Sequence, residues 1–308
     1  MRILSALILA AAAAFAPVAA ADDLWTEDFD AAKAAAAAGG KDLLIDFTGS
    51  DWCGWCIRLK EEVFDTPEFR AAATASFVLV EIDFPRRKPQ DAAVKARNQA
   101  LGQAFGVEGY PTIWLADGSG RPYAKTGYQE GGPEAYLAHL AELRQRREVR
   151  DQALAAAAAA TGIEQARALD RALQALGDDL PLGPYAAEID RIIALDADNG
   201  AGLKGRYAAQ RTKGEVMALL EAGDIDKARP RIAALRDDAG APAALRQEMA
   251  MVEATIRYRA DDRAGAIEQL RLAITLDPSS EQSQMLGEVV TRLQEELAAE
   301  SATAPSAP

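Results

Sequence analysis

Residues 43–56 have the sequence LLIDFTGSDWCGWC, in which an apolar run leads into two cysteines two positions apart. The run Leu43–Phe47 is almost continuously apolar, which predicts a strand buried on both faces of a sheet. Cys53 and Cys56 are the only cysteines in the chain of 308 residues. At this spacing two thiols can close a disulfide within one helical turn, so the redox chemistry of the chain is expected here.

The segments around this stretch predict one α/β domain over residues 22–148. Three further strands are expected, at 77–84, 110–115 and 121–125, with a turn at 117–120 between the last two. Helices are expected at 28–38, 57–64, 91–105 and from Pro133 to about Arg147. The resulting order of elements is α-β-α-β-α-β-β-α, a central sheet flanked by helices.

From Val149 onward strand-like runs disappear, which predicts an all-α domain over residues 149–300. Apolar residues recur at helical spacing, as at Leu245, Met249, Val252 and Ile256. The stretches 223–229 and 261–267 echo one another, and each leads into an apolar helical run. Paired helices of this kind resemble tetratricopeptide repeats, with an irregular period. The small-residue segment 301–308 predicts a disordered tail.

The first 21 residues predict a secretory signal peptide. Met1-Arg2 precedes an apolar stretch at 3–15. A run of small residues follows and ends at Ala21, where cleavage is expected. An anchoring helix is the alternative, but the stretch is short for a membrane span. After cleavage we expect a periplasmic protein without membrane insertion. A disulfide persists in that compartment. A disulfide between Cys53 and Cys56 closes a very short loop and would stabilise the fold little, which favours a redox role.

The charge and the glycine pattern limit the partners of the chain. The formal net charge of −13 argues against nucleic acid and anionic membranes. No glycine motif for a nicotinamide or flavin is present, so no organic cofactor is expected. A redox role would then require a separate protein as electron donor, such as a membrane electron transporter.

Three motifs carry a family resemblance. Asp46-Phe47, Trp52-Cys53-Gly54-Trp55-Cys56 and Gly109-Tyr110-Pro111-Thr112 stand in the order and approximate spacing of the thioredoxin superfamily. Residues 49–68 also resemble exported thioredoxin-like proteins and the C-terminal thioredoxin-like domain of the bacterial membrane electron transporter DsbD. The resemblance covers roughly residues 24–143 and implies a thioredoxin-like fold.

The two cysteines are assigned different roles. A helix N-terminus lowers the pKa of a thiol, so Cys53 is expected to be the nucleophile that forms a mixed disulfide. Cys56, one turn further on, would resolve it by attacking Cys53. The alternatives are a static disulfide or a zinc pair. Zinc requires about four ligands, and the chain offers these two cysteines and the distant His139.

The resemblance implies further site residues. Pro111 would be a cis proline packed against the disulfide, with Tyr110 pairing with a bound substrate strand; the alternative is a trans proline at the start of a strand. Asp46, one position further from Cys53 than in thioredoxin, would accept the proton of the resolving thiol. The alternative is a solvated aspartate at a strand end.

Trp52 and Trp55 flank the thiols and are expected to shield the disulfide and contact substrates, with ordinary packing as the alternative. The cluster Arg144–Arg150, interleaved with glutamates, is expected to be a solvated helix face.

These features predict an exported thiol–disulfide oxidoreductase that reduces or isomerises disulfides in client proteins. The absence of a histidine beside Cys53 favours a reductase over an oxidase. The alternative is a thioredoxin-fold binding or scaffold module whose helical domain docks a partner. Copper delivery is disfavoured, since the pair has no histidine nearby.

Overall fold

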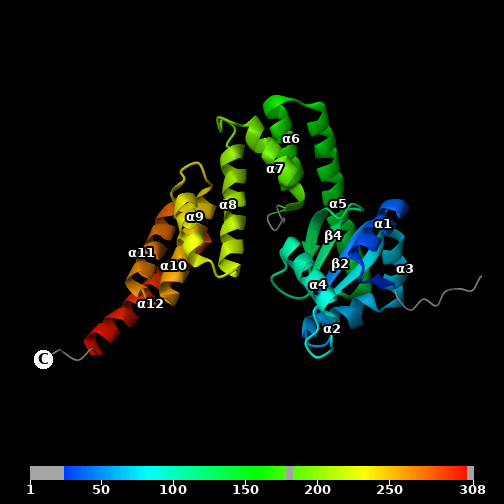
Figure 1. Ribbon diagram of the computed structural model, residues 1–308, viewed down its shortest axis with the longest axis horizontal. Helices are drawn as coiled ribbons and strands as arrows, with labels where there is room; N and C mark the ends of the chain where they lie inside the picture. Colours follow the sequence, from blue (N-terminus) through cyan, green and yellow to red (C-terminus); the bar gives the residue numbers. More distant parts are fainter. Residues whose placement is uncertain (1–23, 178–182, 304–308) are drawn as a thin grey trace, which may run out of the picture.

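The computed structural model describes residues 24–177 and 183–303. Figure 1 shows a sheet-containing region followed by an array of helices, with α5 leading from one into the other. The fold class predicted from the sequence is confirmed, with an α/β region around a mixed sheet first and a largely helical region after it. The predicted signal peptide lies outside the described residues. Part of the predicted tail does too, although α12 continues to Thr303.

The sheet has five strands in the order β1-β3-β2-β4-β5. Their bounds are β1 Trp25–Thr26, β2 Asp42–Thr48, β3 Phe77–Asp83, β4 Thr112–Ala116 and β5 Pro122–Thr126. β3 pairs in parallel with β1 and β2, whereas β2–β4 and β4–β5 are antiparallel. Every residue of the central strand β2 is buried, as its apolar sequence predicts.

Helices cover both faces of the sheet. Leu43, Ile45 and Phe47 of β2 join one apolar cluster with α1 (Phe29–Gly39) and the end of α4 (Ala92–Ala104). Leu44 points to the opposite face, because side chains alternate along a strand. That face carries α2 (Gly54–Leu59), the π-helix η1 (Lys60–Phe64), α3 (Pro67–Ser76) and the start of α5 (Gly132–Ala159). Asp46 has the same parity as Leu44 and therefore faces these helices.

The structure contains elements that the sequence did not predict. β1 is two residues long, too short for a hydrophobic pattern. α3 begins at Pro67 with the Thr66 hydroxyl accepting from the Phe69 backbone N–H, an N-terminal cap next to a proline in the first turn. α5 extends to Ala159 rather than ending near Arg147. The proposed domain boundary at 148–149 therefore falls inside one continuous helix.

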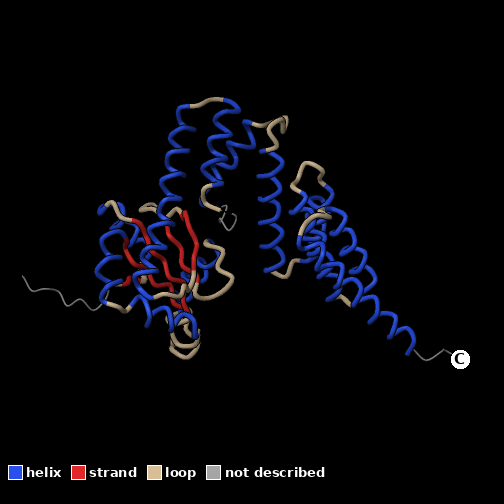
Figure 2. Tube along the Cα trace, turned by 180° about the vertical axis from the view of Figure 1, so that it is seen from behind, coloured by secondary structure: helices blue, strands red, loops and turns tan. Residues whose placement is uncertain are grey.

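The helical region follows the chain in order. Its helices are α6 (Gly162–Gln174), α7 (Ala186–Leu195), α8 (Leu203–Glu221), α9 (Ile225–Asp237), α10 (Ala243–Arg259), α11 (Arg263–Leu276) and α12 (Glu281–Thr303), with the short η2 (Gly183–Tyr185) before α7. Each helix from α6 onward packs on the one before it, and the array can be followed in Figure 2. The echoing stretches at 223–229 and 261–267 occupy equivalent places, at the starts of α9 and α11. Among the described residues, no helix is long and apolar enough to cross a membrane.

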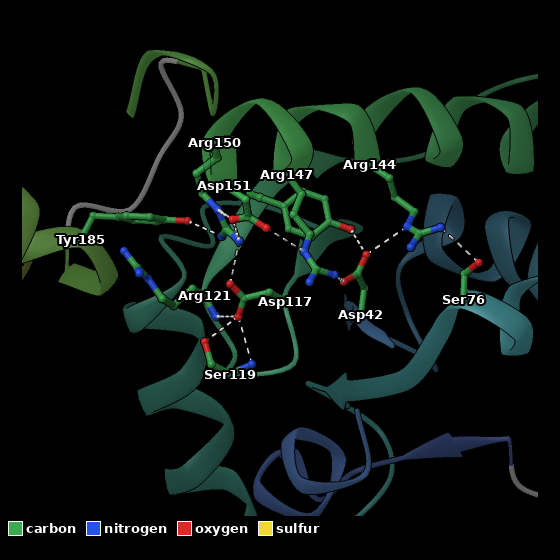
Figure 3. Close-up of polar contacts among 11 residues, drawn as sticks. Asp42, Ser76, Asp117, Ser119, Arg121, Arg144, Arg147, Arg150, Asp151 and Tyr185 are labelled. Carbon is green, nitrogen blue, oxygen red and sulfur yellow. Dashed lines mark hydrogen bonds and ion pairs between the residues drawn. The ribbon is translucent and has the colours of Figure 1, made fainter. Parts of the chain in front are cut away.

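The two regions are joined by a polar network beneath α5 (Figure 3). Arg150 is only 2% exposed and pairs with Asp117 at 2.8 Å and with the Tyr185 hydroxyl at 2.9 Å. The buried Asp42 accepts from the Tyr123 hydroxyl and pairs with Arg144 and Arg147. Although Arg146 is exposed, the expectation of a solvated arginine face is therefore wrong for Arg150, which is buried, and for Arg144 and Arg147, which are half-buried. α5 lies over the sheet edge, and these arginines satisfy carboxylates that packing has removed from water.

Candidate active site

Cys53, at the end of the loop that follows β2, forms a disulfide with Cys56 in the first turn of α2. Cys53 is the N-cap of α2, and its sulfur accepts from the Cys56 backbone N–H at 3.2 Å. The two side chains are 7% and 4% exposed. The sulfur of Cys53 therefore takes the place of a capping oxygen, where the free N–H groups of a helix N-terminus favour negative charge. When the disulfide opens, the same contact would stabilise a Cys53 thiolate.

The peptide bond between Tyr110 and Pro111 is cis. Pro111 directly precedes β4, and the pairing of Thr112 with Phe47 places it beside the end of β2, where the loop to Cys53 begins. The Thr112 hydroxyl donates to the carbonyl of Gly109 at 2.8 Å and holds this turn. The backbone pairing of β2 with β4 thus brings the proline segment and the cysteine loop to one edge of the sheet.

Trp52 is held against the loop that follows β3. Its indole N–H donates to the Phe84 carbonyl at 2.8 Å, and its ring meets Tyr110 edge-on at 5.7 Å between centroids. A side chain at position 49 would collide with this indole, since a Cβ on Gly49 would lie 2.6 Å from it. Trp52 is therefore packed into the site and connects the cysteine loop to Tyr110.

Trp55 lies between the cysteines in sequence and is 55% exposed. Its ring contacts Tyr128 at 5.2 Å between centroids, and the Arg58 guanidinium lies over both rings. Glu62 fixes this group by pairing with Arg58 at 2.7 Å and accepting from the Tyr128 hydroxyl at 2.6 Å. The result is an ordered, exposed aromatic surface next to the disulfide, of the kind that contacts polypeptides.

Asp46 is only 5% exposed, and its Oδ1 has no hydrogen-bond partner within the described part of the chain. Burial, together with the nearby carboxylates of Glu81 and Asp83, raises the pKa of Asp46 well above its ordinary value, while Lys60 acts in the opposite direction. Lys60 pairs with Glu81 at 3.0 Å. The alternative of a solvated strand-end aspartate is thereby excluded.

Lys60 and Glu81 also border a cavity of about 570 Å³ that opens between residues 24–27 and η1. Glu81 lies opposite Asp46 in the pairing of β2 with β3. Neither Lys60 nor Glu81 belongs to a motif that the sequence reveals, and only the strand register brings Glu81 beside Asp46. Within residues 24–177 and 183–303, no three metal-ligating side chains gather into a group. His139 lies away from the thiols and contacts the Thr126 hydroxyl.

A disulfide at a helix N-terminus, a cis proline at the start of the strand that pairs with β2, and a mixed sheet define a thioredoxin-like thiol–disulfide oxidoreductase. The family model for the thioredoxin-like domain matches residues 29–144. The chain is 34% identical over 124 residues to the disulfide bond reductase DsbH of Chlamydia pneumoniae. This match covers 40% of this chain and 74% of DsbH. The chain therefore belongs to the thioredoxin-like family.

Other relatives match over smaller shares of their own length. Identity to the thioredoxin-related protein DsbJ of Chlamydia pneumoniae is 30%, over 34% of this chain and 30% of DsbJ. Identity to the thiol:disulfide interchange protein DsbD of Klebsiella pneumoniae is 29%, over 35% of this chain and 17% of DsbD. A solved structure of DsbH oxidoreductase aligns with 31% identity and a TM-score of 0.38, over 45% of this chain and 94% of that one.

Proposed function

We propose that this chain is an exported oxidoreductase that reduces or isomerises disulfides of client proteins through a Cys53/Cys56 dithiol–disulfide cycle. The observation that carries the proposal is the position of the Cys53 sulfur at the N-terminus of α2, together with a cis Tyr110–Pro111 bond directly before β4, the strand that pairs with β2. Relatives named as a disulfide bond reductase and a thiol:disulfide interchange protein support the same chemistry.

The reaction follows from the two sulfur positions. In the reduced protein the Cys53 thiolate attacks one sulfur of a client disulfide, so that a Cys53–client mixed disulfide forms and one client sulfur leaves as a thiolate, which takes up a proton. Cys56 then attacks the Cys53 sulfur, restores the Cys53–Cys56 disulfide and releases the second client thiol. Two electrons pass to the client, and a donor dithiol must return them.

Asp46 is the proposed proton acceptor for Cys56. A carboxylate with a raised pKa can take a proton from a thiol near neutral pH and return it in the reverse step. Its unpartnered Oδ1 and its position on the sheet face that carries α2 support this role. Trp55, Trp52 and Tyr110 would contact the client around the mixed disulfide, with the backbone at Tyr110 and Pro111 pairing with its strand.

A trapping experiment tests the proposal. Cys56→Ala leaves Cys53 without a resolving thiol, so client proteins should accumulate as mixed disulfides that dithiothreitol releases. Cys53→Ala is the matched control and should trap none. If Cys56→Ala accumulates no mixed disulfide with any disulfide-bearing protein of the exported fraction, the proposed cycle is wrong. Equilibration of the Cys53/Cys56 pair against glutathione then assigns the direction: a low potential supports a reductase and a high one an isomerase.

A second candidate function concerns the helical region. Helices α8 to α12 pack in chain order. The second helix of the pair α8–α9 and that of the pair α10–α11 begin with similar sequences, which is the organisation of repeat arrays that bind peptides. We propose that this region docks a client or assembly partner and that it is tetratricopeptide-like. A Cys53→Ala variant that retains clients as well as the unaltered chain would favour docking without redox work.

Export is part of the proposal and rests on residues 1–21 of the sequence. Fractionation of cells that express the full chain should place the mature protein outside the inner membrane. Deletion of residues 2–21 should retain it in the cytoplasm.

A further inference from the structure

The loop after β3 carries three consecutive cations, Arg86, Arg87 and Lys88, between two prolines. All three side chains are exposed. Within the described residues no carboxylate pairs with any of them. The whole chain has a net charge of −13, so this concentration of positive charge stands out from the rest of the surface.

The cysteine loop holds this segment in place. The carboxylate of Asp51, two residues before Cys53, accepts the backbone N–H groups of Arg86, Arg87 and Lys88 at 2.9, 2.7 and 2.8 Å. These bonds, the one from Arg86 first, lower the pKa of Asp51, which keeps the carboxylate charged. The three cations are therefore fixed beside the disulfide through their own backbone.

Two further contacts attach the same loop to the site. Asp83 accepts the backbone N–H and the hydroxyl of Ser50 at 2.9 and 2.6 Å. The Arg86 guanidinium lies 3.4 Å from the centroid of the Trp52 ring, which in turn contacts Tyr110. The guanidinium of Arg86 over the Trp52 ring, and the edge-on contact of that ring with Tyr110, thus lead from this loop to the residue that precedes the cis proline.

The charge around the disulfide is uneven. On the side of Trp55, the cation Arg58 is neutralised by Glu62. On the side of Trp52, the half-buried carboxylates of Asp51 and Asp83 each accept hydrogen bonds from the neighbouring loop, whereas Arg86, Arg87 and Lys88 are exposed. Glu108, two residues before Tyr110, is exposed as well. A partner that approaches the disulfide therefore meets exposed cations on the side of Trp52. On the side of Trp55 it meets an aromatic surface whose cation, Arg58, is paired with Glu62 and lies near Glu130.

From this arrangement we propose that Arg86, Arg87 and Lys88 form a specificity surface that selects polypeptides with carboxylates beside the reacting disulfide. The inference rests on the proposed function and names the chemistry of its partner. Ion pairs at an exposed rim act mainly on selection and on the association rate, and salt weakens them.

The test uses the full chain and two synthetic peptides, each with one internal disulfide, that differ only in flanking glutamates or flanking lysines. At low salt the reduced protein should react about tenfold faster with the glutamate peptide, since three exposed ion pairs together are worth roughly 1.4 kcal/mol. The difference should shrink as salt is raised to about 0.5 M, where the Debye length falls below ~5 Å.

The variant Arg86→Gln/Arg87→Gln/Lys88→Gln keeps the backbone N–H groups that bind Asp51 and should lose the preference. The matched control, Arg167→Gln/Arg211→Gln/Lys227→Gln, removes the same charge from exposed positions in the helical region and should retain it. A preference that survives in the loop variant, or is absent from the unaltered chain, overturns the inference.

Neutral 2-hydroxyethyl disulfide separates this inference from the proposed function. If the unaltered chain does not reduce it, the proposed cycle itself fails. If the loop variant slows equally with the neutral disulfide and both peptides, the cations act on the Cys53 thiol, and the specificity surface is again overturned.

Discussion

The sheet region and the helical region are stabilised in different ways. In the first, strands distant in sequence pair side by side, and large side chains such as Phe47, Phe69 and Trp114 are almost fully buried between sheet and helices. In the second, each helix packs on its neighbours in sequence, and alanines such as Ala250 and Ala273 fill much of the interface. The first arrangement can hold a turn and two thiols in fixed positions, whereas the second provides an extended surface.

This comparison explains where the chemistry lies. The cysteine loop, the cis proline segment and the buried Asp46 are held by β2, β3 and β4, which pair across long sequence separations. A helix in an array is positioned by its neighbours alone, so small errors accumulate along the chain. Four predictions test the contrast.

The largest expected effect separates chemistry from fold. Cys53→Ser should abolish reduction of client disulfides, because the attacking thiolate is gone, while the far-UV circular dichroism of the chain stays unchanged. The assay is turnover of a peptide disulfide with a chemical reductant as donor. Residual turnover above that of a Cys53→Ser/Cys56→Ser double variant would assign the chemistry elsewhere.

The second prediction compares the two cores directly. Phe69→Ala empties a fully buried site against η1 and α5 and should cost about 3–5 kcal/mol of the free energy of unfolding. Ala250→Gly, also fully buried but in α10, should cost about 1 kcal/mol. Urea unfolding followed by circular dichroism measures both. Equal costs would mean that the two regions do not differ as described.

The third prediction concerns the junction. Arg150→Met leaves Asp117 without its buried partner and should destabilise the protein by about 3 kcal/mol. Reduction of a small neutral disulfide should be unaffected below the melting transition, since Arg150 is not part of the active site. Arg167→Met, at an exposed ion pair in α6, is the control and should change stability by less than about 1 kcal/mol.

The smallest effect on stability is expected at Asp46 and depends on pH. Burial raises the pKa of Asp46, so the folded protein keeps a proton that the unfolded chain releases above about pH 4. Stability should therefore fall as pH rises from there through the raised pKa. Asp46→Asn should remove this dependence of the unfolding free energy on pH in the oxidised protein. It should also slow the attack of Cys56 on the mixed disulfide by up to about a hundredfold. Unfolding free energies of both proteins from pH 4 to 9 provide the check; an unchanged slope would show that Asp46 does not titrate in this range.

Some elements could be predicted from the sequence because their signals are local. The strands at Leu43–Phe47 and 77–84 consist of apolar runs, and the helix after Asp28 has its cap and its stop within the same segment. α3 was missed, although Thr66 and Pro67 mark its start. The length of α5 was misjudged because the change of composition at Val149 coincides with no helix break.

The sequence by itself determined the cysteine pair, the proline segment, the succession of the four longer strands along the chain and the change from mixed to helical structure, because each depends on neighbouring residues. Only the tertiary structure decided that Glu81 lies opposite Asp46, that Asp51 fixes three cations beside the disulfide and that Arg150 is buried against Tyr185. The residues in each of these contacts are about 30 to 40 positions apart in the sequence. Strand register and helix packing bring them together, and no local pattern specifies either.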